Sequence, residues 1–249
     1  MIRNSFLITN SQYSKKAIVE AYGIDKTIVL SPPVAVNNIR NSLGFSSHSK
    51  ISYEPRNNLV LVICRIEPSK RIENAIYLAK VLKEKKIEAK MIIVGSWDPY
   101  YQKYYEDLKG LIIDKDISDM ITFKINASFD ELIELMKKSK VYFHPREGEH
   151  FGISVAEAMS AGLVPVVPTI GGQAEFVPTK YQYNSFEQAS QIVASALDIA
   201  DKERQRISDS VMRFSETDYK RQFQLIISKL IYNVNIDKQY NFPNFPSIN

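Results

Sequence analysis

From Leu59 onward, short apolar runs alternate with longer segments that have helical periodicity. Five runs are rich in β-branched and aromatic residues and have the length of strands: 59–64, 89–95, 120–125, 140–145 and 163–168. Between them, residues 70–86 and 129–138 place apolar residues on one helical face. This alternation is typical of successive β-α units. We therefore predict an α/β fold with a Rossmann-like parallel sheet, helices on both faces, and ligands bound at the carboxyl ends of the strands.

The sequence downstream of the last strand predicts three more helices, at about 185–199, 201–213 and 217–233. The pattern of the third predicts burial of its apolar side chains Phe223, Ile226, Ile227 and Leu230. The remaining tail, 234–249, is predicted to have no regular secondary structure.

The first 48 residues have a different organisation. We predict a strand at 6–9, a short helix at 11–22 capped by Ser11, and a second strand near 27–30 that ends at Pro32 and Pro33. Two strands and one helix are too few to enclose a core. This part therefore needs packing partners elsewhere.

The length of 249 residues and the hydrophobic content of 45% suit one domain, or one domain plus a fragment. No apolar run has the length of a membrane span, and the first residues do not resemble a cleavable leader, so we predict a cytoplasmic protein, with the cytoplasmic membrane face as the alternative. The only cysteine, Cys64, excludes an intrachain disulfide. The net charge of +4 is spread along the chain and does not indicate nucleic acid.

The segment 144–168, HPREGEHFGISVAEAMSAGLVPVVP, predicts a strand end, a glycine-containing turn and a helix that starts near Gly152. A helix start offers free N–H groups and the positive end of the helix dipole, which favour a phosphate. Glu149 and Glu157 are positioned to face the strand ends, where carboxylates can accept hydrogen bonds from sugar hydroxyls.

Glu149 and Glu157, with Phe151-Gly152-Ile153 between them, resemble the Glu-x7-Glu motif of retaining glycosyltransferase family four, the group one enzymes of GT-B fold. The surrounding Pro145, Glu-Ala-Met and Gly-x-x-Pro-Val-Val make the match specific. The resemblance implies that Glu149 contacts the donor sugar and that Glu157 holds the ribose hydroxyls. It also implies that the backbone of Phe151, Gly152 and Ile153 follows the diphosphate and sugar.

A second resemblance covers Arg65 to Lys70, which matches the family's Arg-x4-Lys. Two cations at the sheet edge can neutralise the leaving diphosphate as its charge develops. The resemblance thus implies Arg65, Lys70 and Glu149 as the catalytic set. The family usually has a glycine after this lysine, whereas Arg71 follows here. We therefore expect the local turn to differ and Arg71 to share in binding the phosphate.

Weaker matches complete the predicted pocket: Gly95 and Ser96 after the second strand, Lys124 and Ile125 after the third, where the family meets the nucleobase, and Gly171-Gly172 after the fifth. Glu175 is given no role. We expect His144 to pack at a strand end and His150 to lie on a turn without a partner, so neither is a predicted acid–base group.

Asp114-Lys115-Asp116 spells the metal-binding Asp-x-Asp of another glycosyltransferase class. It lies in a polar connection between a helix and the third strand rather than at a strand end, and Arg65 and Lys70 already supply the counter-charge. We predict no metal site and no cofactor, the ligand being the donor substrate, a GDP-sugar or UDP-sugar.

The resemblance also accounts for the first 48 residues, which look like the last β-α-β of the family's acceptor-binding domain and the interdomain linker. It implies four parts: that remnant (1–48), a nucleotide-sugar-binding domain (49–214), a helix that crosses back to the first domain (215–233) and a tail (234–249). The earlier part of the acceptor domain is expected to be missing, with its glycine-rich loop and histidine. A partner chain or a homo-oligomer is expected to compensate.

The resemblance therefore implies the donor domain of a retaining transferase that moves a sugar to a glycan or lipid-linked acceptor. The segment Glu-His-Phe-Gly-Ile resembles mannosyltransferases that extend lipid-linked oligosaccharides, and this resemblance favours GDP-mannose. The alternatives are a non-catalytic nucleotide-sugar-binding subunit and a truncated transferase that needs a separate acceptor domain. A sugar epimerase of the same fold is disfavoured, because such enzymes lack the Glu-x-Phe-Gly-Ile context.

Overall fold

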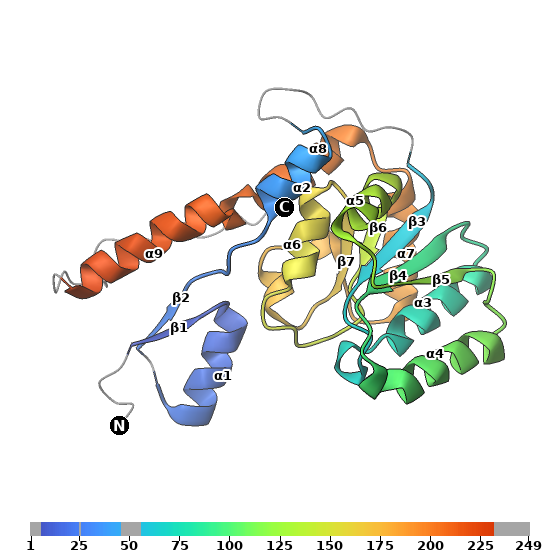
Figure 1. Ribbon diagram of the computed structural model, residues 1–249, viewed down its shortest axis with the longest axis horizontal. Coiled ribbons are helices and arrows are strands. Elements are labelled where there is room, and N and C mark those ends of the chain that lie inside the picture. The colour runs from blue at the N-terminus through green and yellow to red at the C-terminus, as the bar shows by residue number, and fades with distance from the viewer. Residues whose placement is uncertain (1–5, 25, 46–55, 232–249) are drawn as a thin grey trace.

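The computed structural model describes residues 6–24, 26–45 and 56–231 (Figure 1). Both the predicted tail at 234–249 and the predicted boundary at residues 48 and 49 lie outside the described residues. Within the described part, no helix combines the length and apolar character needed to cross a membrane.

The central element is a six-stranded parallel sheet with the order β5-β4-β3-β6-β7-β8. Its strands are β3 (Leu59–Ile63), β4 (Lys90–Gly95), β5 (Ile121–Ile125), β6 (Val141–Phe143), β7 (Val164–Pro168) and β8 (Gln182–Tyr183). The first five correspond to the five predicted runs, and β8 was not predicted. The strand order reverses between β3 and β6, and such a reversal in a doubly wound sheet is where ligands bind.

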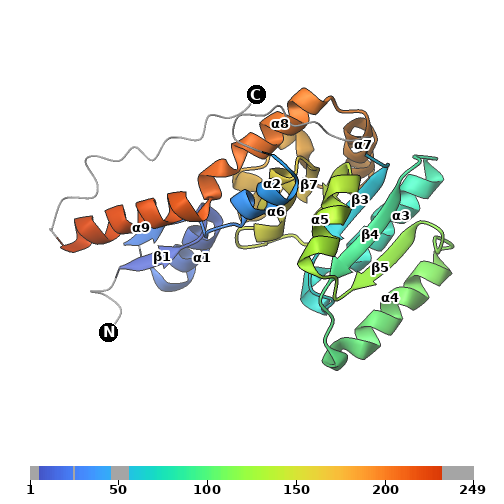
Figure 2. The ribbon, with the colours of Figure 1, turned by 45° about the horizontal axis from the view of Figure 1, so that its top comes forward.

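Helices cover both faces of this sheet, as predicted (Figures 1 and 2). The helix α3 (Glu73–Glu84) packs between α4 (Gln102–Asp114) and α7 (Phe186–Leu197) on one face. The other face carries α5 (Phe129–Lys138) and α6 (Ile153–Ser160), and α8 (Asp201–Ser210) packs on α6. Because both faces are covered, the central strands are apolar along their whole length, and Tyr142 and Phe143 of β6 are fully buried.

The predicted helix at 70–86 begins later than expected. The residues Pro68–Lys70 form a 3₁₀ turn, and Arg71 follows in the left-handed conformation with φ of 53° before α3 begins at Glu73. Arg71 therefore adopts the conformation that glycine tolerates best. The expected difference between this turn and the family's turn stays a prediction.

The N-terminal segment forms β1 (Leu7–Thr9), α1 (Gln12–Tyr22) and β2 (Thr27–Val29), with β1 and β2 paired in parallel. The Ser11 side chain caps α1 by accepting from the Ser14 backbone N–H, as predicted. The helix α2 (Val36–Ser42), which was not predicted, follows and packs on α6.

The last described helix, α9 (Glu216–Ile231), extends away from the sheet on the side that carries β1 and β2 (Figures 1 and 2). Of the four side chains predicted to be buried, Ile226 is buried, Leu230 is partly covered, and Phe223 and Ile227 are exposed. The prediction was wrong for these two, because only one side of α9 meets other described residues.

Candidate functional site

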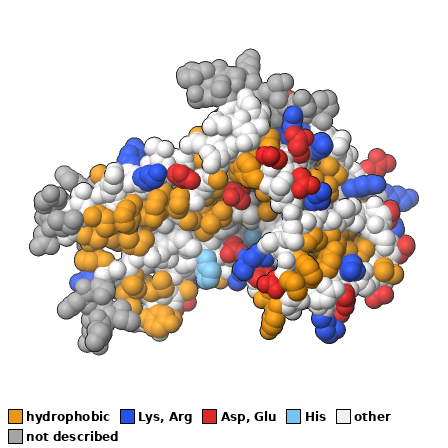
Figure 3. All heavy atoms as spheres, viewed as in Figure 1, with side chains coloured by type: hydrophobic (Ala, Val, Ile, Leu, Met, Phe, Trp, Pro, Cys, Tyr) orange, Lys and Arg blue, Asp and Glu red, His pale blue; other side chains and the backbone are white. Residues whose placement is uncertain are grey.

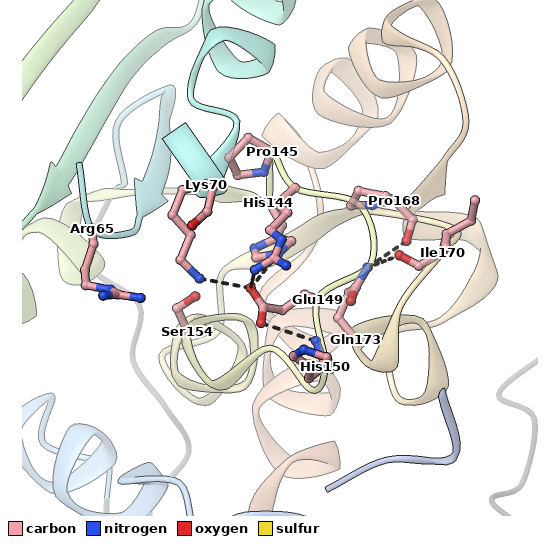
Figure 4. Close-up of polar contacts among 12 residues, drawn as sticks. Arg65, Lys70, His144, Pro145, Glu149, His150, Ser154, Pro168, Ile170 and Gln173 are labelled. Carbon is pink, nitrogen blue, oxygen red and sulfur yellow. Dashed lines mark hydrogen bonds and ion pairs between the residues drawn. The ribbon is translucent and has the colours of Figure 1, made fainter. Parts of the chain in front are cut away.

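The candidate site lies where the strand order reverses, at the carboxyl ends of β3 and β6 (Figure 4). The segment 64–70 leaves β3, and the segment 144–152 leaves β6 and leads into α6. The parallel pairing of β3 with β6 brings these two segments together, although they are about 80 residues apart in the sequence. Two of the predicted motifs therefore meet at one edge of the sheet.

The centre of the site is an ion pair between Lys70 and Glu149. The Nζ atom of Lys70 lies 3.1 Å from Oε2 of Glu149, and both side chains are less than a fifth exposed. The same oxygen lies 3.6 Å from Nη1 of Arg146 and 4.0 Å from Nε2 of His144. Burial disfavours the charged carboxylate, but the charge and hydrogen bond of Lys70, followed by His144 and Arg146, outweigh it and lower the pKa of Glu149. Glu149 is therefore an ionised acceptor.

Arg65 lies at the outer side of this centre. Its side chain is 67% exposed, and its Nη2 atom lies 3.0 Å from Oε1 of the buried Glu67. Arg71 is also exposed and pairs with Glu73 at 3.4 Å. The structure thus brings Lys70 into contact with Glu149, while Arg65 and Arg71 are held by other carboxylates.

Gly95 permits the close approach of β4 to the chain leaving β3. A Cβ atom at this position would lie 1.7 Å from the carbonyl oxygen of Cys64, so any larger residue would force the backbone apart. The next residue, Ser96, accepts a hydrogen bond from the Ile66 N–H at 2.8 Å through its carbonyl. Gly95 and Ser96 therefore shape the loop that carries Arg65 and Lys70.

The start of α6 is open. Gly152 stands at its N-cap with φ of 97°, a conformation that favours glycine, and offers no side chain to cap the helix. The Phe151 ring is buried against Phe176 and Phe214 with centroids 5.1 Å apart, whereas the Ile153 side chain is about half exposed. The aromatic cluster fixes the turn from which α6 starts.

The loop after β7 supports the Glu149 loop. The Gly172 N–H donates to the carbonyl of Glu149 at 2.7 Å, and a Cβ atom on Gly172 would lie 2.0 Å from the carbonyl oxygen of His150. Gln173 is buried and donates through Nε2 to the carbonyls of Pro168 and Ile170. Gly171 and Gly172 thus belong to the site's frame.

Glu157 lies on the second turn of α6, and burial alone raises its pKa. It differs from Glu149, whose neighbouring cations keep it charged. A half-buried carboxyl group without cation support is suited to hydrogen bonding with neutral hydroxyls.

Lys124 and Ile125 lie at the end of β5, separated from β3 by β4. The Lys124 ammonium is 2.7 Å from Oε1 of Glu131 at the start of α5, and this contact lowers the pKa of Glu131 to about 2. In this structure Lys124 is therefore engaged by α5, and its predicted contact with a nucleobase stays a prediction.

Sequence reasoning missed several contacts around the site. Arg146 was not singled out, although a cation three residues before Glu149 is a usable signal. His150 was expected to have no partner, but its Nδ1 atom lies 3.2 Å from Oγ of Ser14. Glu175, left without a role, accepts hydrogen bonds from the backbone N–H groups of Gln12 and Tyr13 at the start of α1, at 3.1 and 2.7 Å.

The segment Asp114-Lys115-Asp116 connects α4 to β5, as predicted. Asp116 has φ of 54° and pairs with Lys83 at 3.2 Å. Across the residues that the structure describes, no group of three or more His, Cys, Asp or Glu side chains is arranged to hold a metal ion.

Comparison with known proteins agrees with this geometry. The family model described as glycosyl transferases group 1 matches residues 46–221. Two curated relatives are both named GDP-Man:Man(3)GlcNAc(2)-PP-Dol alpha-1,2-mannosyltransferase. The Dictyostelium discoideum protein is 29% identical over 84% of this chain and 43% of its own length, and the Neurospora crassa protein is 26% identical over 87% and 44%. This chain thus spans less than half of the length of these relatives.

Solved structures show the same fold. Anabaena HepE in complex with UDP-glucose superposes with a TM-score of 0.72 at 19% identity, covering 92% of this chain and 65% of that chain. A glycosyltransferase from Rickettsia africae gives a TM-score of 0.71 at 19% identity, with 93% and 64% covered.

Proposed function

Because the chain belongs to the glycosyl transferases group 1, we propose that it binds a nucleoside diphosphate sugar at the Lys70–Glu149 centre and serves as the donor half of a retaining transferase. The observation that carries this proposal is the convergence of Lys70, Glu149 and the uncapped start of α6 at the point where the strand order reverses. A cation and a free helix N-terminus suit a diphosphate, and an ionised carboxylate beside them suits sugar hydroxyls.

In the proposed arrangement, Lys70 and Arg65 neutralise the diphosphate, Glu149 accepts from hydroxyls of the donor sugar, and Glu157 accepts from the ribose. The backbone of Phe151, Gly152 and Ile153 lies along the diphosphate and sugar. During transfer, the bond from the sugar's anomeric carbon to the phosphate oxygen breaks, and a bond to the acceptor oxygen forms on the same face. The acceptor proton passes to the leaving phosphate, whose charge the cations stabilise.

GDP-mannose is the proposed donor, and a lipid-linked glycan is the proposed acceptor. The support is that the curated relatives at 26–29% identity carry both in their printed names. UDP-sugars are the alternative donors. The protein is proposed to act in the cytoplasm, at the face of the membrane that holds such an acceptor.

A non-catalytic nucleotide-sugar-binding subunit, or a transferase half that needs a separate acceptor domain, is the alternative function. Both versions share the donor site, and a transfer assay separates them.

Calorimetric titration against GDP, UDP and their sugars tests the donor site. Lys70→Ala and Arg65→Ala should each weaken GDP binding by about 1.5–3 kcal/mol, with the larger effect for the less exposed Lys70. Asp114→Asn is the matched control and should bind as the wild type does. Equal GDP affinity in the wild type and both cation variants, all verified as folded, would show that the pocket is elsewhere.

Donor binding is proposed to need no divalent metal, because the counter-charge comes from protein groups. Titration in EDTA should then give the same affinity as titration in magnesium or manganese. Loss of binding in EDTA with recovery on adding metal would contradict this proposal.

A further inference from the structure

A buried chain of polar side chains lies behind Glu149 and is used by none of the roles proposed above. The hydroxyl of Tyr142 lies 2.8 Å from Oγ of Ser154 and 3.1 Å from Nδ1 of His144. His144 is 4% exposed, and within the described part of the chain its Nε2 atom has no hydrogen-bond partner. That atom lies 4.0 Å from Oε2 of Glu149 (Figure 4). A buried ring nitrogen without a partner is costly and needs an explanation.

The neighbours of His144 determine where its proton lies. If Nε2 carried a lone pair, that lone pair would face the Glu149 carboxylate and be repelled by it. The favoured tautomer therefore has the proton on Nε2 and a lone pair on Nδ1, which accepts from the Tyr142 hydroxyl. The Tyr142 oxygen then accepts from Ser154. The hydrogen bonds thus run in one direction, from Ser154 through Tyr142 to Nδ1 of His144, and leave the Nε2 proton 4.0 Å from Oε2 of Glu149.

We propose that His144 is a positioning residue, which holds the Glu149 carboxylate in the orientation that receives the hydroxyls of the donor sugar. This inference rests on the proposed function of the same site. Ser154 stands in the first turn of α6, so the chain also links the carboxylate to the helix that is proposed to meet the diphosphate.

A second support for Glu149 is needed once the donor is bound. The Lys70 ammonium is 3.1 Å from Glu149 in this structure, but it is also a cation proposed to pair with the diphosphate. When the diphosphate competes for Lys70, Glu149 keeps Arg146 and His144 as neighbours. Arg146 is on a loop and partly exposed, whereas His144 is buried and oriented by Tyr142. His144 is therefore the neighbour whose position beside the Glu149 carboxylate stays fixed.

The charged groups that face His144 are Glu149, Lys70 and Arg146. Burial lowers the pKa of His144 to about 4, with Lys70 and Arg146 acting in the same direction and Glu149 opposing them. The imidazole is thus a neutral N–H donor at and well below neutral pH. The preference for GDP-mannose over GDP should consequently stay constant from pH 8 to pH 5.5, a range in which an ordinary histidine would titrate.

Two buried tyrosines provide a matched pair of variants. The Tyr142 hydroxyl contacts the His144 ring, whereas the Tyr183 hydroxyl donates to the His144 backbone carbonyl at 3.0 Å. Calorimetry with GDP and GDP-mannose on the full chain gives the ratio of the two affinities. Tyr142→Phe and His144→Phe should each reduce the GDP-mannose advantage by about tenfold while GDP affinity is unchanged. Tyr183→Phe should keep the wild-type ratio, and His144→Gln, which restores an N–H donor, should recover part of it.

The outcomes separate the two proposals. If the wild type binds neither ligand, the proposed function fails and the positioning role fails with it. If the wild type prefers GDP-mannose and Tyr142→Phe keeps that preference, the donor site stands and the positioning role is overturned. Should His144→Phe fail to fold, Tyr142→Phe still decides, because it removes a single hydroxyl and retains the ring.

Discussion

His144 and Glu149 show how one buried site sets opposite protonation preferences on adjacent residues. Burial keeps the imidazole neutral, while Lys70 keeps the carboxylate charged. A neutral donor next to an ionised acceptor can be stable across the pH range in which most proteins work. This arrangement predicts a specific pH dependence of stability.

The free energy of unfolding should fall between pH 6.5 and about pH 4 because of His144. The folded pKa of about 4 lies below the ordinary value of 6.5, so the unfolded chain takes up a proton in this window and the folded chain does not. The contribution is complete above pH 6.5 and is lost as the pH falls. Urea unfolding at a series of pH values from 7.5 to 5 gives the free energy of unfolding as a function of pH. The slope of this free energy against pH should be steeper in the wild type than in His144→Phe, by up to about 1.4 kcal/mol per pH unit.

Glu149 adds a separate contribution at lower pH. Its pKa is lowered, so the stability it provides is present above its ordinary value of 4.5 and is lost as the pH falls through its folded pKa. Above pH 5, the difference in stability between the wild type and His144→Phe therefore measures the contribution of His144 alone. Parallel stability curves for the wild type and His144→Phe over this range would show that the imidazole titrates normally.

At the scale of elements, α1 depends on a carboxylate from a distant loop. Glu175, which follows the 171–172 glycines, accepts from the first two N–H groups of α1, and His150 contacts Ser14 one residue further on. The loops that frame Glu149 thus also hold the N-terminal segment. A movement of α1 relative to the sheet would therefore change its contacts with both the His150 loop and the Glu175 loop.

Glu175→Ala should loosen α1 selectively. Loss of a charged acceptor at a helix N-terminus costs about 1–2 kcal/mol, so hydrogen exchange of the α1 amides should accelerate by roughly 5–30-fold. Ser128→Ala is the control, because it removes the local capping box of α5 and should leave α1 protection unchanged. Unchanged α1 exchange in Glu175→Ala would mean that Ser11 alone stabilises this helix start.

The sequence predicted the elements that carry their own signal. The five strands were predicted because each is a short run rich in β-branched and aromatic residues, and the Glu149 and Lys70 motifs because their context is specific. The two-residue β8 and the polar α2 were missed, since β8 depends on its pairing with β7 and α2 on its packing against α6. The left-handed conformation of Arg71 could not be predicted, because no glycine stands at this position. The approach of His144 and Arg146 to Lys70 follows from the β3–β6 pairing, which no local pattern reveals.

At the scale of the whole molecule, α9 and the β1–β2 segment present apolar side chains to solvent. Phe223, Leu225 and Ile227 of α9, and Phe6 and Ile8 of the β1–β2 segment, are more than a third exposed. Figure 3 shows the hydrophobic side chains gathered along α9. A contiguous exposed apolar surface of this kind indicates an interaction site.

This chain is expected to bind the donor without transferring the sugar until an acceptor-binding region is supplied. Positioning donor and acceptor together contributes much of a transferase's rate, and the proposed donor site is one half of that cleft. A transfer assay on lipid-linked acceptors, with and without a co-expressed acceptor domain, measures this. The chain alone should also self-associate with rising concentration in light scattering. Sustained transfer by the purified 249-residue chain would refute the expectation.

The capping of α1 by Glu175 has a consequence for synthesis on the ribosome. The carboxylate and the N–H groups that it caps are 162 and 163 residues apart, and Arg40 of α2 meets Ser208 across 168 residues. At about 5–20 residues per second, roughly 8–30 s pass between the emergence of α1 and that of its cap. During this interval α1 and α2 lack these later partners. Nascent chains should therefore be captured by chaperones most strongly before residue 175 has left the exit tunnel.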